Sequence, residues 1–423
     1  MKRSGKKSVI FFLLCLALAG CASRQPQDIS EPSEIAERGT ESISPESASA
    51  ETPLPAPAAA PTAMSAAAPT AMSAAAPTAM SAATPTATPA ATPEPTSEPV
   101  DTSFDFTICF AGDINLDENW DTTRFLDTQP GGIYDCISPE LSEAMRAADI
   151  MCLNNEFTYS TGGAPLPGKA YTFRADPERV EVLDQLGVDA VTLANNHVYD
   201  YGEEALLDTF TVLEEAGVPY FGAGRTLEEA MQPLYLEVDG KTVALVAASR
   251  AEKNKMTPQA TDSAPGILRC YDTELFLQVI QEGKANADFC IAFVHWGTEY
   301  SYDLERVQLD TGKAYLDAGA DVVIGAHSHC LQGMEYYDGK PIIYSLGNYW
   351  FNNKTLDTML LQLHFSGDDE QSELEVQVVP AVQSGCRTTY AQDADEQRRI
   401  FDFLESISVN VEISDEGIVT EAE

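Results

Sequence analysis

From Phe104 onwards, short apolar runs alternate with stretches of helical periodicity, and this alternation restricts the fold more than any other feature. The runs are rich in β-branched residues, which is typical of buried strands, and they cover residues 104–110, 150–153, 190–193, 243–247, 289–294, 322–324 and 342–344. Helical periods end at Gly187, Gly217 and Gly319, as helices commonly do; they cover residues 178–186, 203–216 and 307–318. This pattern predicts an α/β domain with a largely parallel sheet.

Towards the C-terminus the pattern changes. Segments 360–365 and 374–379 alternate between apolar and polar residues, which indicates antiparallel strands. The stretch beyond about Thr388 is acidic, and we expect it to be peripheral. We therefore place the folded domain at residues 104–385 and an acidic C-terminal extension at residues 386–423.

The first 20 residues have the composition of an export signal. Four basic residues among the first seven precede an apolar run over residues 9–19, which is too short to cross a bilayer comfortably as a permanent helix. The run ends in Leu-Ala-Gly-Cys at Cys21, which resembles a lipobox. We predict a lipoprotein signal peptide at residues 1–20 and lipidation of Cys21, and hence an extracytoplasmic, membrane-anchored lipoprotein. An ordinary signal peptide followed by an incidental cysteine is the alternative.

Residues 21–103 form a segment rich in Pro, Ala and Thr. The sequence APTAMSAA recurs within it with a period of eight, and no aromatic residue lies between Cys21 and Phe104. Such a composition lacks the large apolar groups that a core needs. We therefore predict a disordered linker, which suits a domain held away from a membrane and through a cell wall.

The charge of the domain excludes one class of partner. The residues after Val100 hold 19 basic and 57 acidic side chains. A surface this acidic repels phosphate backbones, so we expect no binding to nucleic acid. The acidity has a simpler interpretation as well, because it keeps a domain soluble.

The cysteines give no disulfide framework. Seven remain after Cys15 of the signal peptide and Cys21 are set aside, and an odd number argues against complete pairing. Cys330 follows a histidine motif, and we interpret it as a structural residue.

Six side chains able to bind a metal lie just after predicted strands. The chain has five histidines, and four of them occupy such positions. Because the carboxyl ends of parallel strands form the ligand crevice of an α/β sheet, we expect these groups to meet at one sheet edge. Carboxylate, amide and imidazole ligands without cysteine suit Mn, Fe or Zn in a catalytic site. The six are Asp113, Glu156, His197, His295, His327 and His329.

Each of these motifs has a structural interpretation when taken alone. Gly112-Asp113 is compatible with a simple turn, and Glu156 with a helix N-cap. Asn195-Asn196-His197 is compatible with a turn that carries a surface histidine. The pair His327 and His329 is a stronger signal, because two imidazoles in this spacing can reach one centre. His364 lies inside a strand-like run, and we interpret it as structural.

The order of these motifs resembles that of the calcineurin-like metallophosphoesterases. The pattern of that family is D-x-H, GD, GN-H-D/E, H and GH-x-H. Here Asn115 replaces the histidine of the first motif, and Glu156 replaces the bridging aspartate of the second. Asn196-His197, His295 and His327-Ser328-His329 match the remaining motifs. The Asn115 departure implies that one of two metals is bound loosely.

The longer blocks resemble the CapA, or poly-γ-glutamate capsule biosynthesis, family. They are FAGDINL at 110–116, the stretch 173–202 with ANNHVYDYG, YFGAGRTLEEA at 220–230, HWGTEY at 295–300, and the stretch 317–351 with YSLGN. The resemblance covers roughly residues 104–385 and implies a metallophosphoesterase-like α/β sandwich. Three positions depart from it, namely Asn155, Ala326 and Ser328.

This resemblance implies a role for each site residue. Two divalent metal ions, Mn, Fe or Zn, are expected. Asp113, Asn115, Glu156 and His329 would bind one ion, and Glu156, Asn196, His295 and His327 would bind the other. His197 would protonate the leaving group, oriented by Asp200.

Three functions remain open on the sequence. The first is a two-metal hydrolase acting on a phosphoester or a related polymer bond. The second is a non-catalytic accessory protein for making, exporting or anchoring an anionic capsular polymer such as poly-γ-glutamate, together with capsule-synthesis membrane proteins. The strong acidity fits a polyanionic partner poorly unless bound metals reverse the local charge. The third is a surface binding protein unrelated to a capsule.

Overall fold

The computed structural model describes residues 102–252 and 256–422. Cys21, the signal peptide and nearly all of the linker predicted for residues 21–103 lie outside these ranges, so those predictions stay open. The described chain forms two larger sheets and two small two-stranded ones. The small sheets pair β3 (Thr158–Tyr159) with β4 (Arg174–Ala175) and β7 (Ala223–Gly224) with β10 (Gly266–Ile267).

The first large sheet has the order β19-β20-β17-β16-β1-β2-β5-β6, with β15 beside β1 and β18 beside β17. Strands β1, β2, β5 and β6 are parallel, whereas β16 and the strands beyond it are antiparallel. The strands are β1 (Phe104–Ile114), β2 (Ile150–Asn155), β5 (Ala190–Thr192), β6 (Tyr220–Phe221), β15 (Asn348–Trp350), β16 (Leu356–Gly367), β17 (Ser372–Ser384), β18 (Arg387–Tyr390), β19 (Val411–Ile413) and β20 (Ile418–Glu421).

The second large sheet has the order β13-β14-β12-β11-β9-β8. Its four central strands are parallel, and each edge strand pairs with its neighbour in antiparallel orientation. The strands are β8 (Leu234–Val238), β9 (Lys241–Ser249), β11 (Phe289–His295), β12 (Val322–Ala326), β13 (Leu331–Tyr337) and β14 (Lys340–Leu346). All seven apolar runs predicted as strands are confirmed by these two sheets.

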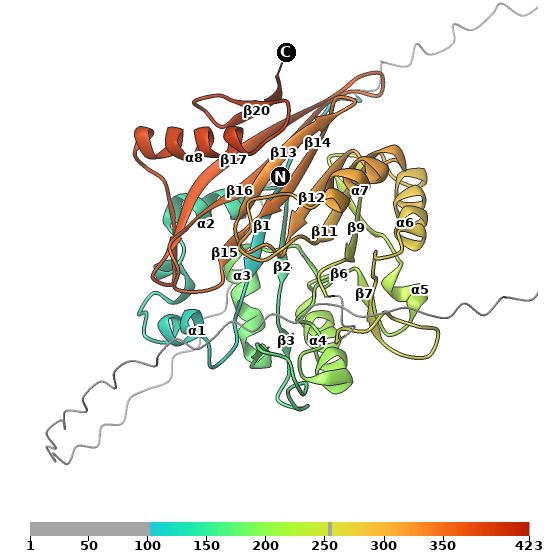
Figure 1. Ribbon diagram of the computed structural model, residues 1–423, viewed down its shortest axis with the longest axis vertical. Coiled ribbons are helices and arrows are strands. Elements are labelled where there is room, and N and C mark those ends of the chain that lie inside the picture. Colours follow the sequence, from blue (N-terminus) through green and yellow to red (C-terminus); the bar gives the residue numbers. More distant parts are fainter. Residues whose placement is uncertain (1–101, 253–255, 423) are drawn as a thin grey trace, which may run out of the picture. The chain divides into compact units, whose positions relative to one another are not determined.

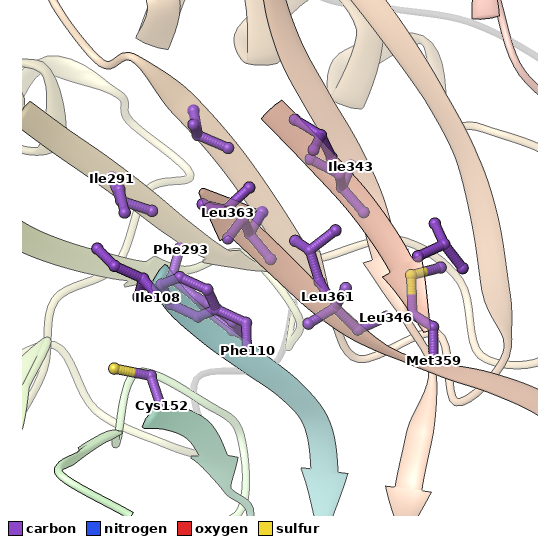
Figure 2. Packing of buried hydrophobic residues seen from close by; sticks show 14 of the residues in the cluster. Ile108, Phe110, Cys152, Ile291, Phe293, Ile343, Leu346, Met359, Leu361 and Leu363 are labelled. Carbon is purple, nitrogen blue, oxygen red and sulfur yellow. The ribbon is translucent and has the colours of Figure 1, made fainter. Parts of the chain in front are cut away.

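The main core lies between the two sheets. In β1, Ile108 and Phe110 point inwards and meet Ile291 and Phe293 of β11, with the Phe110 and Phe293 rings stacked 6.3 Å apart (Figure 2). The intervening Cys109 belongs to a different cluster on the outer face of the first sheet. This alternation follows from the two-residue period of a strand, and it fixes which side of each strand faces the core.

Helices cover the outer face of each sheet. Apolar residues of α1 (Asp121–Leu126), α2 (Pro139–Ala147), α3 (Glu181–Leu186) and α4 (Gly202–Ala216) pack on the first sheet, and those of α6 (Glu274–Ala285) and α7 (Arg306–Asp317) pack on the second. Figure 1 shows α7 beside β12 and α4 beside β3, and α6 contacts β9 and β11. The predicted α/β sandwich is confirmed. The remaining helices are η1 (Gly132–Asp135), η2 (Pro177–Val180), α5 (Leu227–Ala230) and α8 (Ala394–Ser406).

The predicted helix ends are also confirmed. Gly187 and Gly217 follow α3 and α4 with φ of 73° and 71°, a left-handed conformation that glycine adopts at little cost. The helical period at 178–186 divides into the 3₁₀ turn η2 and α3. Within the described residues, no helix is both long and apolar enough to cross a membrane.

Two expectations are corrected. The parallel strands do not share one sheet, because β1, β2, β5 and β6 belong to the first sheet and β9, β11, β12 and β14 to the second. The residues after 385 are not a peripheral extension. Strand β18 pairs with β17, and Phe401 and Leu404 of α8 are buried in the core between the sheets.

Candidate metal centre

Two groups of possible metal ligands meet where strands of both sheets end. One group comprises Asp113, Glu156 and His329, and the other comprises Glu156, His295 and His327. Within each group the ligand atoms lie within 4.8 Å of one another, and all the residues are buried. Asp113 and Glu156 follow or end strands of the first sheet, whereas the histidines come from the second. The centre therefore joins two sheet edges, and not one edge as the sequence predicted.

A close contact between two backbones places Asp113. A Cβ atom on Gly112 would lie 1.9 Å from the carbonyl oxygen of Gly347, so only glycine fits there. The Asp113 amide donates to the same carbonyl at 3.0 Å. Asp113 is thereby aligned with Asn348 of β15 in parallel register.

The two histidines after β12 lie in a tight, irregular turn. His327 and His329 have φ of 93° and 54°, values that are uncommon for residues with a side chain and often occur at functional sites. The intervening Ser328 hydroxyl contacts the Cys330 carbonyl at 2.7 Å and the Ser345 hydroxyl at 2.8 Å. These contacts fix the conformation of the turn and keep the imidazoles of His327 and His329 at the candidate metal centre.

The carboxylates of Asp113 and Glu156 are fully buried. The Asn154 amide donates to Asp113 Oδ1 at 2.7 Å and lies 3.4 Å from Glu156 Oε2. Asp113 Oδ2 and Glu156 Oε1 accept no hydrogen bond. Burial, and next the charge of Asp113, raise the pKa of Glu156 well above its usual value.

His295 lies between these carboxylates and Asn196. Its Nε2 is 2.7 Å from Asn196 Oδ1 and 3.4 Å from Glu156 Oε1. His327 lies beside it, with ring centroids 4.7 Å apart, and its Nδ1 has no hydrogen-bond partner. Burial lowers the pKa of both imidazoles well below the usual value, and neighbouring histidines add to the effect. Both rings are therefore neutral at pH 7, the form that binds metals.

His329 is held by the first sheet. Its Nδ1 lies 2.8 Å from Asn348 Oδ1 and 3.2 Å from Asp113 Oδ2. Asn115 is also buried, but its Oδ1 accepts the backbone amide of Asp117 at 2.7 Å and its Nδ2 is unpaired. Asn115 therefore closes a local turn, and its proposed contact with a metal stays a prediction.

The donor set fits divalent cations. Two buried carboxylates face three imidazoles, and among the described residues only histidines lie within ion-pair distance of Asp113 and Glu156. Isolated buried carboxylates are unfavourable unless a cation or a proton compensates them. The unpaired oxygens of both carboxylates and the unpaired nitrogen of His327 offer lone pairs of the kinds that Mn, Fe and Zn accept.

His197 lies beside this centre, oriented by Asp200. Its Nδ1 is 2.6 Å from Asp200 Oδ2, and its Nε2 is 3.9 Å from Glu156 Oε1. Asp200 is fully buried and forms an ion pair at 2.6 Å with Lys169, whose side chain is only 7% exposed. Lys169 also donates to the Asn196 carbonyl and pairs with Glu252 at 3.1 Å. The predicted pairing of His197 with Asp200 is thus present in the structure.

The family assignment follows from comparison with known proteins. The model of the family "Bacterial capsule synthesis protein PGA_cap" matches residues 107–353. The chain belongs to this family. The resemblance seen in the sequence is confirmed, and the matched range contains every residue of the candidate metal centre.

Curated relatives carry corresponding names. The PGA biosynthesis protein CapA of Bacillus subtilis is 33% identical over 236 residues, which cover 54% of this chain and 61% of that protein. The capsule biosynthesis protein CapA of Bacillus anthracis is 35% identical over 196 residues, 45% of this chain and 47% of that one. The chain thus spans only about half to three-fifths of the length of these relatives. A solved structure of a putative 5′-nucleotidase from Staphylococcus aureus is 18% identical, with a TM-score of 0.40, and covers 71% of this chain and 58% of that one.

Three polar residues of this family member were not predicted as part of the site. Asn154 lies near the end of β2, two residues before Glu156, and directly follows the predicted strand at 150–153, so the rule used for the other ligands applies to it. Asn348 begins β15 and lies inside the block at 317–351 that resembles the family. Lys169 lies in a loop without a regular pattern, and nothing in its sequence neighbourhood indicates a contact with Asp200. The structure also confirms that His364 is outside the site, since it lies 3.0 Å from Asp105.

Proposed function

We propose that this capsule-synthesis family member is a surface-anchored protein with a two-metal hydrolase centre that acts during the synthesis, export or anchoring of an anionic polymer such as poly-γ-glutamate. The observation that carries the proposal is the position of Glu156, which belongs to both ligand groups. A carboxylate shared in this way is suited to bridge two cations, which would otherwise repel each other at the roughly 3.5–4 Å spacing of two-metal sites.

Each ligand group would hold one cation of Mn, Fe or Zn. Asp113 and His329, with Asn115 nearby in the chain, supply one side of Glu156; His295 and His327, with Asn196, supply the other. When bound, two such cations activate water and withdraw charge from a scissile phosphoryl group. The neutral state of His295 and His327 leaves their ring nitrogens free to coordinate without losing a proton.

His197 would hold the proton that the leaving group needs. With Nδ1 on Asp200, its Nε2 faces Glu156 and the open side of the centre. In the protonated ring, Nε2 donates to the departing oxygen, and the Asp200 carboxylate stabilises the imidazolium beforehand. Lys169 in turn balances the Asp200 charge and fixes the carbonyl of Asn196.

Two observations support the proposed role at the cell surface, namely the family of the chain and its N-terminal sequence. Family members are named for capsule synthesis, and the lipobox-like Cys21 supports a lipid anchor. Membrane proteins of capsule synthesis are the corresponding partners. Replacing Cys21 by Ala should shift the protein from the membrane fraction to the soluble extracytoplasmic fraction; an unchanged membrane association would contradict the anchor.

Two variants separate the hydrolase from a non-catalytic polymer-binding accessory protein. Metal content is measured by elemental analysis, and hydrolysis is measured on a generic phosphodiester and on poly-γ-glutamate. In a hydrolase, Glu156→Ala loses metal and activity, whereas His197→Ala keeps its metal and loses about 10²–10⁴-fold in rate. In an accessory protein, His197→Ala keeps full function in capsule formation and only Glu156→Ala abolishes it. Full metal content and full function in both variants would refute both functions.

A further inference from the structure

A cavity of about 280 Å³ lies against the candidate metal centre, and His197 and His329 form part of its lining. Because His197 Nε2 lies 3.9 Å from Glu156 Oε1, the cavity borders the buried ligand groups. Apart from these two histidines, most of its wall belongs to loops after β1, β11 and β15 and before β4. The chemistry of that wall therefore decides which molecules the centre accepts.

Aromatic rings dominate the wall. Trp120 packs edge-on against Phe173 at 5.0 Å and against Tyr171 at 6.0 Å between ring centroids. Phe173 packs in the same way against Phe351 at 5.5 Å. Tyr171 is 59% exposed, so its ring at this cavity remains open to a ligand; Tyr300 is 41% exposed, but the ammonium of Lys354 lies over its ring. Pockets with aromatic walls and a few polar groups are typical small-molecule sites.

Only one lysine or arginine is among the residues that line the cavity. This is Lys354, whose ammonium lies 3.5 Å from the centre of the Tyr300 ring. Asp121 and Glu299 line the same cavity. One cation beside two carboxylates is a poor surface for a polymer that carries one carboxylate on every residue. It suits a ligand with a single anionic group and an uncharged body.

We infer that the cavity selects phosphoesters whose organic group carries a ring, a sugar or a nucleobase, over extended γ-glutamyl chains. This rests on the proposed hydrolase function, since it places the phosphate at the metal centre. The ring of the ligand lies against Tyr171 and Trp120, and Lys354 faces the anionic group from the other side. The cavity volume of about 280 Å³ lies just below the roughly 300 Å³ at which pockets for drug-sized ligands begin, so the cavity is suited to about one ring and its phosphate.

Binding of phosphonate analogues tests this selection, because their C–P bond is not hydrolysed. Analogues of glucose 1-phosphate, adenosine 5′-monophosphate and glycerol 3-phosphate, and a γ-linked glutamate oligomer, are titrated into the full-length, Zn²⁺-loaded chain by calorimetry. Stacking of a nucleobase on an aromatic side chain strengthens binding by roughly tenfold. We therefore expect at least one ring-bearing analogue to bind about tenfold tighter than the glycerol analogue, and the stronger of the two identifies the ring as sugar or base.

Variants of the aromatic residues test whether these residues cause the tighter binding of ring-bearing analogues. Tyr171→Ala and Trp120→Ala should each weaken the ring-bearing analogue about five- to tenfold more than they weaken the glycerol analogue. Tyr134→Ala is the control, since Tyr134 is 45% exposed but does not line the cavity. Equal binding of the three analogues, tighter binding of the glutamate oligomer, or no binding at all would overturn the inference.

The outcome is independent of catalysis. A chain that selects ring-bearing analogues but hydrolyses nothing refutes only the proposed function. A chain that hydrolyses phosphoesters without any preference for a ring refutes only the selection by the aromatic wall.

Discussion

His197 and His329 occupy similar positions on the two sides of the centre, but they differ in one partner. Each is about 5% exposed. Each ring lies against a phenylalanine, Phe173 at 4.5 Å for His197 and Phe351 at 4.6 Å for His329. The Nδ1 atom of His197 lies 2.6 Å from the carboxylate of Asp200. The nearest partner of His329 Nδ1 is the amide oxygen of Asn348 at 2.8 Å, and the carboxylate of the candidate ligand Asp113 follows at 3.2 Å.

The partner of Nδ1 decides what each ring can do. A carboxylate stabilises the protonated imidazole, so His197 is suited to carry a proton. The amide oxygen of Asn348 accepts from Nδ1 of His329, a contact that suits this ring to present Nε2 to a metal. In the proposed hydrolase, the same side chain would therefore serve as an acid on one side and as a ligand on the other.

The largest expected effect comes from changing the partner of His197. Asp200→Asn keeps the shape of the side chain but removes the charge that stabilises the imidazolium. We expect a loss of about 10³–10⁴-fold in kcat for phosphodiester hydrolysis, with metal content unchanged. Rates and elemental analysis on the same preparation provide the check. A parallel loss of metal would show that Asp200 supports the ligands and not the acid.

Lys169 gives a second test of this difference, because among the described residues no lysine or arginine forms an ion pair with Asp113 on the His329 side. Lys169→Met leaves the fully buried Asp200 without its cation, and such a loss costs about 3–5 kcal/mol in the free energy of unfolding. Urea unfolding of the metal-free protein measures it.

The matched control for this change is Lys284→Met. Lys284 pairs with Asp321 at 2.9 Å but is 36% exposed, so we expect a cost of at most about 1 kcal/mol. Similar costs for the two variants would mean that solvent screens Asp200 as well, and that the ion pair with Lys169 has no special role in holding His197.

The sequence predicted one side of this comparison better than the other. His197 and Asp200 lie three residues apart in a recognisable block, so their pairing follows from local sequence. His329 and Asn348 are nineteen residues apart, and their contact depends on β15 joining β1 through the close approach of Gly112 and Gly347. Nothing in the local pattern encodes that approach.

The difference between local and long-range signals also explains which parts of the fold could be predicted. Buried strands and helix ends were predictable, because period and glycine signals are local. The division into two sheets was not, since β5 and β11 read alike as apolar runs and only long-range packing assigns them to different sheets. The segment after residue 385 was predicted to be peripheral because its average composition is acidic. Its helical period was the better guide, since Ile400, Phe401 and Leu404 of α8 are buried.

A smaller effect is expected on the ligand side. Asn348→Ala removes the contact that orients His329, and the loss of such a supporting hydrogen bond typically lowers metal affinity about 10–100-fold. We expect kcat to recover when metal is added in excess, unlike in Asp200→Asn. Activity as a function of Mn²⁺ or Zn²⁺ concentration tests this, and a kcat that stays low at saturating metal would assign Asn348 a role beyond the ligand.

The smallest effect is the dependence of metal affinity on pH. A metal binds ionised Glu156, whose pKa is raised by burial and by Asp113. Below that raised pKa a proton must leave before the metal binds, so affinity should increase with pH, by at most about tenfold per unit. His295 and His327 have lowered pKa values; both are already neutral above pH 6.5 and release no proton.

Calorimetric titration of Zn²⁺ at pH 6.5, 7.0 and 7.5 measures this slope in a non-coordinating buffer. One proton released per centre is the expected result, because the pKa of Glu156 is raised whereas those of His295 and His327 are lowered. His197→Asn should leave the slope unchanged, since His197 is not among the proposed metal ligands. A slope of two or three protons would mean that histidines are charged in the metal-free protein, and the division between an acid side and a ligand side would then fail. A flat profile would mean that Glu156 is ionised before the metal arrives, and that burial does not keep its proton in place.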